Sequence, residues 1–172
     1  MAYYMFETEW LLTAPIEEVF ELASHPESYS EWWPGVKESR LLDAGDDDGI
    51  GRTGAYTIQS PLGYRMHFET KAIEVDRPNK VVTAVRGDLI GTGTHHLEAR
   101  DNGTHVRFDW YVSTTKKWMN TIAGIARPGF AFAHRYVMYN GCDGMARALG
   151  GRLVTATSRL VQTPTPLQVT RQ

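Results

Sequence analysis

The sequence predicts one α+β domain, in which a curved antiparallel sheet of about seven strands wraps around a long C-terminal helix, with two short helices after the first strand. Two observations predict this fold class. Between residues 36 and 114, apolar and polar residues alternate and are interrupted by glycine, asparagine, aspartate and proline, which is typical of consecutive antiparallel strands. After residue 114, apolar residues recur at spacings of three and four, which is typical of an amphipathic helix. We expect residues 1–150 to form the domain and residues 151–172 an irregular tail.

The composition narrows the class of protein. The chain has 172 residues, 42% of them hydrophobic, which is enough to bury one core without disulfides or metals. Its 18 basic and 20 acidic side chains nearly cancel and form no long block of one sign, so the pattern of a nucleic-acid or anionic-membrane binder is absent from the sequence. Glu7 and Glu9 stand where a signal peptide would be apolar, and no segment reaches membrane-spanning length. We therefore expect a cytoplasmic protein, either monomeric or homodimeric.

The lone cysteine agrees with this expectation. Cys142 cannot form an intrachain disulfide, which suits a reducing compartment. Its neighbours Gly141 and Asp143 give no sign of an activated thiolate, so the sequence favours a structural role over a catalytic one.

The first quarter of the chain predicts one strand and two short helices. The strand covers Tyr3–Leu12, and Thr13 is the expected N-cap of a helix that has Pro15 in its first turn. That helix should end before Pro26, and a short helical turn should follow over residues 29–33. One face of the first helix is apolar, with Ile16, Val19, Phe20 and Ala23.

Six further strands are expected, near residues 37–43, 50–60, 63–75, 80–87, 90–100 and 104–114. The last two form a hairpin, because Asn102-Gly103 is the preferred pair for a two-residue turn. With those two residues as the loop, the apolar face pairs Ala99 with Val106, Leu97 with Phe108, His95 with Trp110 and Gly93 with Val112. The opposite face pairs Glu98 with Arg107, His96 with Asp109 and Thr94 with Tyr111, a row of complementary charges.

The strand near 63–75 changes its alternation part-way. Its apolar positions fall on one parity at Met66 and Phe68 and on the other at Ile73 and Val75, and a β-bulge between them would reconcile the two. The same alternation favours outward orientation of three polar side chains, Arg65, His67 and Glu69.

The C-terminal helix is predicted from two apolar stripes separated by Pro128, which marks a kink or a restart. The first stripe contains Trp118, Ile122, Ile125 and Ala126. The second contains Phe130, His134, Val137, Met138, Gly141 and Met145. Gly141 falls on the apolar side, which predicts a close approach to the sheet or to a bulky facing side chain.

The order of elements, together with several segments, resembles the START-like SRPBCC superfamily, which has the helix-grip fold, and in particular its bacterial polyketide cyclase/dehydrase-like members. The matching segments are residues 13–20 with Pro26 and 32–34, residues 74–78, 87–93 and 103–110, and residues 134–149. The resemblance implies a deep apolar cavity between sheet and helix. Some members use such a cavity to bind or carry lipids, sterols and hormones, and others use it to fold and dehydrate polyketide chains.

Two histidines are the candidate polar groups of such a cavity. His95 lies on the inward face of the predicted hairpin, and His134 lies on the apolar stripe of the helix. In a cavity they would orient a ligand or, as tentative catalytic residues, transfer protons. The alternative is that each is a core histidine that binds backbone or water.

Ten residues are expected to line the cavity and bind the ligand: Trp33, Tyr56, Tyr64, Met66, Phe68, His95, Trp110, Phe130, His134 and Met138. The resemblance also implies a cavity arginine and tyrosines that hold a polyketide carbonyl in aromatase/cyclases. Tyr64 and Arg65 are the nearest positions, but Arg65 falls on the outward parity, so this role is not assigned to it.

Possible metal-binding motifs in the sequence lack ligands at the required positions. Asp46-Asp47-Asp48 has the acids of a calcium loop but lacks its first ligand and its glutamate, and His95-His96 must point to opposite faces of a strand. We expect no metal and no cofactor. The leading hypothesis is a protein that binds an apolar or aromatic small molecule; the second is a polyketide cyclase/dehydratase-type enzyme, and the third is an interaction domain whose cavity is filled.

Overall fold

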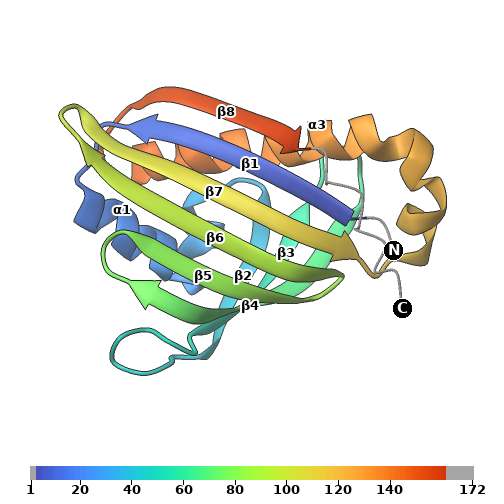
Figure 1. Ribbon diagram of the computed structural model, residues 1–172, viewed down its shortest axis with the longest axis horizontal. Coiled ribbons are helices and arrows are strands. Elements are labelled where there is room, and N and C mark those ends of the chain that lie inside the picture. The colour runs from blue at the N-terminus through green and yellow to red at the C-terminus, as the bar shows by residue number, and fades with distance from the viewer. Residues whose placement is uncertain (1–2, 162–172) are drawn as a thin grey trace, which may run out of the picture.

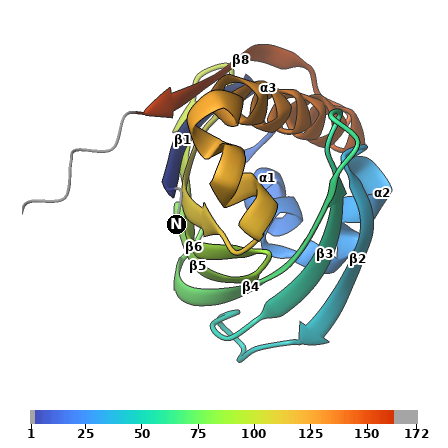
Figure 2. The same ribbon diagram turned by 90° about the vertical axis from the view of Figure 1, so that its right-hand side faces the viewer.

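The computed structural model describes residues 3–161, except for the side chains at 123, 124 and 126. Within these residues, eight strands form one antiparallel sheet. Its strand order is β2-β3-β4-β5-β6-β7-β1-β8. The elements in chain order are β1 (Tyr3–Leu12), α1 (Ile16–Ser24), the 3-10 turn η1 (Pro26–Ser28), α2 (Tyr29–Trp32), β2 (Val36–Asp43), β3 (Thr53–Gln59), β4 (Arg65–Asp76), β5 (Lys80–Gly87), β6 (Leu89–Arg100), β7 (Gly103–Thr114), α3 (Lys117–Ala148) and β8 (Leu153–Val161). Figure 2 shows the sheet curving so that α3 lies between its two ends. This is the predicted helix-grip fold.

The C-terminal segment is more ordered than the sequence indicated. Residues 153–161, expected to belong to an irregular tail, form β8, which pairs with β1 along the edge of the sheet (Figure 1). The prediction failed because β8 has no sustained alternation of its own, and the edge of β1 supplies its hydrogen-bond partners. The Thr163–Pro166 segment lies outside the described residues.

The start of α1 also differs from the prediction. Pro15 stands at the N-cap, and no described side chain caps the helix, so the assignment of Thr13 as N-cap is wrong. The backbone N–H of Thr13 donates to the carbonyl of Arg152, and the backbone N–H of Arg152 donates to the hydroxyl of Thr13 at 2.8 Å. Thr13 therefore holds the segment after α3 instead of the start of α1.

The β6–β7 hairpin has the predicted faces but a different register. Arg100 pairs with Gly103, so Asp101 and Asn102 form the loop, and each residue of β6 lies opposite one two positions earlier in β7 than predicted. His95 thus pairs with Phe108 instead of Trp110. Gly103 has a φ of +139°, and a Cβ there would clash with the carbonyl of Leu12, so this glycine is needed where β1 passes.

The shift leaves the faces unchanged because side chains alternate with a period of two. The inward residues Leu97, Phe108 and Trp110 are buried, whereas Glu98 and Arg107 are exposed.

A bulge interrupts β4 where the alternation changes, as predicted. The β4–β5 register shifts between Ala72 and Glu74, which leaves Ile73 exposed and turns Val75 inward. Upstream of the bulge the polar side chains Arg65, His67 and Glu69 are exposed, so the outward orientation is confirmed.

Only the second apolar stripe of α3 is buried. Phe130, Val137, Met138 and Met145 belong to the core, as predicted. The prediction that the first stripe is buried was wrong. Trp118 and Ile122 are nearly half exposed and Ile125 is 91% exposed, while Met119 is buried in their place. Pro128 lies inside the helix, and Figure 2 shows the N-terminal part of α3, in gold, running at an angle to the rest. That part therefore turns a different face to the sheet.

Candidate functional site

A cavity of about 380 Å³ lies between the concave face of the sheet and α3. All ten residues that the sequence predicted as lining stand on its wall: Trp33, Tyr56, Tyr64, Met66, Phe68, His95, Trp110, Phe130, His134 and Met138. The strand residues reach it by alternation and the helix residues by their spacing of three and four. Their part in binding a ligand stays a prediction.

The sequence analysis missed the contribution of β1. Tyr4 and Phe6 also line the cavity, and their side chains stack at 6.0 Å between ring centroids. The alternation of aromatic residues along β1 was the signal available in the sequence, since Tyr4, Phe6 and Trp10 share one parity, and the structure buries all three.

His95 reaches the cavity from β6. Its ring lies 4.4 Å from that of Phe108, and its Nδ1 is buried with no hydrogen-bond partner in the described part of the chain. Burial, with a smaller contribution from the charge of His96, lowers the pKa of His95 to about 4. The imidazole is therefore neutral at neutral pH and has an unused polar atom at the cavity wall.

His134 lines the same cavity from α3 and is also neutral. Its ring stacks on Phe6 with 3.9 Å between centroids and an interplanar angle of 8°. Burial lowers the pKa of His134 to about 3. Its Nδ1 lies 3.4 Å from the hydroxyl of Ser158, while Nε2 is buried and has no partner among residues 3–161.

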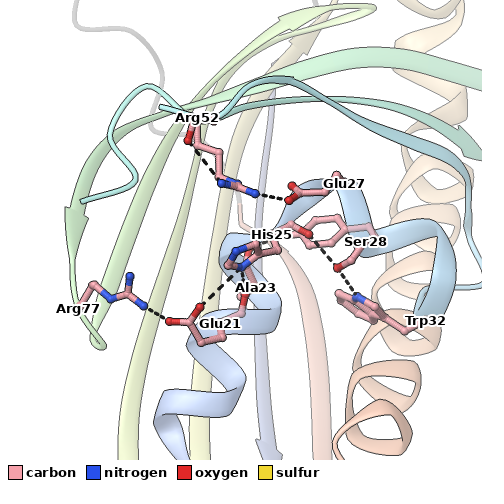
Figure 3. Close-up of polar contacts among 10 residues, drawn as sticks. Glu21, Ala23, His25, Glu27, Ser28, Trp32, Arg52 and Arg77 are labelled. Carbon is pink, nitrogen blue, oxygen red and sulfur yellow. Dashed lines mark hydrogen bonds and ion pairs between the residues drawn. The ribbon is translucent and has the colours of Figure 1, made fainter. Parts of the chain in front are cut away.

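One part of the cavity wall is charged (Figure 3). Arg77 pairs with Glu21 of α1 and Arg52 pairs with Glu27 of η1, so two arginines from the sheet side reach toward the α1–α2 segment. His25 lies between the two pairs, and its Nδ1 is 2.7 Å from the backbone carbonyl of Glu21. These ion pairs link the two walls of the cavity at this place.

The acidic run beside them forms a turn. Asp46 Oδ1 accepts the backbone N–H groups of Asp48 and Ile50, and residues 46–49 line the cavity. No group of three or more histidine, cysteine or carboxylate side chains within the described residues is arranged to hold a metal ion.

Two further candidates take no part in the cavity chemistry. Arg65 is exposed and its Nε donates to Gln59 Oε1 at 2.9 Å, so it does not occupy the place of a cavity arginine. Burial and the neighbouring Asp143 charge raise the pKa of the Cys142 thiol to about 12, which keeps it protonated and unreactive.

Comparison with protein families decides what kind of domain this is. The family model described as "Polyketide cyclase / dehydrase and lipid transport" matches residues 5–161, almost the whole described chain and including β8. The chain belongs to this family. A search of curated protein sequences finds no match to this polyketide cyclase/dehydrase-family protein.

Solved structures show the same fold at low identity. The Zhui aromatase/cyclase from Streptomyces sp. R1128 is 13% identical, with a TM-score of 0.68 over 87% of this chain and 94% of that one. A START superfamily protein from Mycobacterium smegmatis is 17% identical, with a TM-score of 0.57 over 76% and 93%.

The di-domain aromatase/cyclase BexL from the BE-7585A biosynthetic pathway is 15% identical, with a TM-score of 0.68 over 87% of this chain and 51% of that one. At these identities the likeness extends to the fold alone. None of the helices within residues 3–161 has both the length and the apolar composition that crossing a membrane requires.

Proposed function

We propose that this protein binds an apolar or aromatic small molecule, of lipid-like or polyketide-like chemistry, in the cavity between the sheet and α3. The observation that carries the proposal is an aromatic cavity whose wall holds two buried histidine nitrogens that have no hydrogen-bond partner within residues 3–161. Buried polar groups are nearly always hydrogen-bonded, so unpaired ones on a cavity wall are suited to a ligand.

The size and lining of the cavity support the proposal. About 380 Å³ lies within the range of about 300–1,000 Å³ that is usual for small-molecule pockets. Aromatic rings from several elements surround it, with Phe68 and Trp110 at 5.9 Å and Tyr56 and Phe68 at 5.5 Å between centroids. Burial of ligand surface against such rings would supply most of the binding free energy, and the histidines would set the orientation.

The alternative is a cyclase- or dehydratase-type enzyme, and the two cavity imidazoles are the observation in its favour. General acid–base catalysis works best when the pKa of the group lies near the working pH. With pKa values of about 4 and 3, His95 and His134 are weak bases near pH 7, which favours ligand binding over proton transfer.

The proposal is tested with the neutral fluorescent probe N-phenyl-1-naphthylamine and a pair of adjacent tryptophan substitutions in α3. Ala133 is buried and lines the cavity, whereas Phe132 is nearly half exposed and does not line it. We expect the wild type and Phe132→Trp to bind the probe alike and Ala133→Trp, which fills the cavity, to lose at least tenfold in affinity.

Circular dichroism establishes that each variant is folded. A wild type that does not bind the probe, or a folded Ala133→Trp that binds as well as the wild type, would contradict cavity binding. Native mass spectrometry of the protein purified from its own source then tests whether a small molecule is retained.

A further inference from the structure

Three elements meet behind His134 and form a chain of hydrogen bonds. Thr8 of β1 lies directly opposite Ser158 of β8, and its hydroxyl donates to Ser158 Oγ at 2.9 Å. Ser158 Oγ lies 3.4 Å from Nδ1 of His134 on α3. The chain runs from the sheet edge to the histidine ring and ends at Nε2, which is buried without a partner among residues 3–161.

The direction of this chain bears on where the imidazole proton sits. Ser158 Oγ accepts the hydrogen of Thr8, so its own hydrogen is available for donation to Nδ1 of His134. With Nδ1 as the acceptor, the single proton of the neutral imidazole lies on Nε2. Stacking on Phe6 holds the ring in this orientation.

A second polar group stands nearby on the same wall. The hydroxyl of Tyr4 is buried and has no partner in the described chain, and the Tyr4 ring contacts both Phe6 and Phe130. Burial raises the pKa of Tyr4, so its phenol keeps its proton and is a donor too. This part of the cavity therefore offers O–H and N–H donors.

The cation content of the wall decides what kind of acceptor fits. Its arginines, Arg52 and Arg77, are each paired with a glutamate, and no lysine among residues 3–161 lines the cavity. Arg127 lies beside the Tyr4 ring, 5.9 Å from its centroid, but donates to the backbone carbonyl of Tyr3 and is not part of the cavity wall. A carboxylate beside His134 would be buried with no unpaired cation on the cavity wall within residues 3–161, which is unfavourable, whereas a carbonyl oxygen would only need a donor.

We propose that Thr8 and Ser158 are positioning residues that fix His134 in its Nε2–H form, and that this N–H, with the Tyr4 hydroxyl, recognises a neutral acceptor oxygen on an otherwise apolar ligand. The proposal rests on the proposed function, because it assigns a specificity to the same cavity. Because Ser158 belongs to β8, the proposal gives this strand a role in orienting His134 as well as in forming the sheet.

The first test measures the tautomer directly, without a ligand. In long-range ¹H–¹⁵N spectra the two ring nitrogens of a neutral histidine have distinct shifts, so the protonated one is identified. We expect His134 to be Nε2–H in the wild type and in Ser158→Thr, which keeps the hydroxyl, and to become a mixture of tautomers in Ser158→Ala. A wild-type ring protonated on Nδ1, or a Ser158→Ala spectrum like that of the wild type, overturns the positioning role.

The second test measures specificity with three probes of one shape: 2-acetylnaphthalene, 2-ethylnaphthalene and 2-naphthoate, each displacing N-phenyl-1-naphthylamine. The comparison variant is His134→Phe, which keeps a ring on Phe6 but removes the donor. The ratio of the ketone and ethyl dissociation constants is compared between wild type and variant, so that differences in water solubility cancel. In His134→Phe we expect the ketone to lose about three- to tenfold in affinity relative to the ethyl compound, which corresponds to one hydrogen bond. In the wild type we expect the naphthoate to bind weakest.

The outcomes separate the two proposals. Binding of the probes with an unchanged ratio, or tightest binding of the naphthoate, overturns the recognition of a neutral acceptor and leaves cavity binding intact. Failure of all three probes and of N-phenyl-1-naphthylamine overturns the proposed function, and the donor role with it.

Discussion

The indole ring of Trp33 occupies the space that a side chain at Gly141 would need. A Cβ on Gly141 would lie 2.6 Å from Nε1 of that indole, which is closer than real carbon contacts allow. The indole is fixed there because its Nε1 donates to the backbone carbonyl of Val137 at 2.8 Å, one turn earlier in α3. The close approach predicted for Gly141 is thus confirmed, and the bulky partner comes from the end of α2.

Gly141→Ala should therefore destabilise the fold by about 1–3 kcal/mol, because the added methyl group overpacks against Trp33. Gly129→Ala in the same helix is the matched control, since the nearest described atom to a Cβ there is Leu62 Cδ1, at an ordinary 3.6 Å. The control should be neutral or slightly stabilising, because alanine favours helix over glycine. Urea midpoints measure both, and an unchanged midpoint for Gly141→Ala would contradict the contact.

The two cavity histidines should make stability fall in mild acid. Burial holds the pKa of His95 at about 4 and that of His134 at about 3, against 6.5 in a model compound. Below pH 6.5 the unfolded chain therefore binds protons that the folded chain does not, and the free energy of unfolding decreases as the pH falls toward 4. The expected slope is up to about 1.4 kcal/mol per pH unit for each histidine.

Urea unfolding at a series of pH values between 7.5 and 4.5 checks this slope. The double variant His95→Gln, His134→Gln should flatten it, because it removes both buried imidazoles. Equal slopes for the wild type and the double variant would mean that these two rings are protonated in the folded protein.

The Arg77–Glu21 ion pair should control exchange of the ligand more than stability. Both side chains are half exposed, so the pair contributes no more than about 1 kcal/mol to folding. Arg77 nevertheless lines the cavity and its guanidinium lies 4.9 Å from the centroid of the Phe20 ring. We expect Arg77→Gln to speed dissociation of N-phenyl-1-naphthylamine severalfold with little change in the urea midpoint.

Arg100→Gln provides the control for that experiment, since Arg100 forms a similarly exposed pair with Glu98 away from the cavity. Stopped-flow dissociation rates should be unchanged in this variant. If both arginine variants release the probe equally fast, the Arg77–Glu21 pair has no special role at the cavity.

His95→Gln separates a binding protein from an enzyme. Glutamine keeps a hydrogen-bonding group of similar reach, so binding, which depends mainly on burial of apolar surface, should fall only modestly. A proton-transfer role would instead lower turnover of a linear poly-β-carbonyl thioester by on the order of a hundredfold or more. Turnover in the wild type that this variant loses while still binding would refute the carrier function.

The sequence by itself determined which side of β4, β6 and β7 faces the cavity. Side-chain orientation along a strand depends on parity alone, so the alternation in β6 and β7 placed His95 and Trp110 inward even though their predicted pairing was shifted by two residues. The change of parity in β4 located its bulge for the same reason. Local spacing likewise placed Phe130 and His134 on the inner side of α3.

Only the tertiary structure decided which segments meet. Leu12 of β1 passes so close to Gly103 that a side chain there would clash, and β8 pairs along the edge of β1, so both features involve contacts outside the local pattern. The bend in α3 turned Ile125 to solvent although its spacing matched the buried stripe. Parity and period are properties of consecutive residues, whereas the Thr8–Ser158–His134 chain joins three segments that only folding brings together.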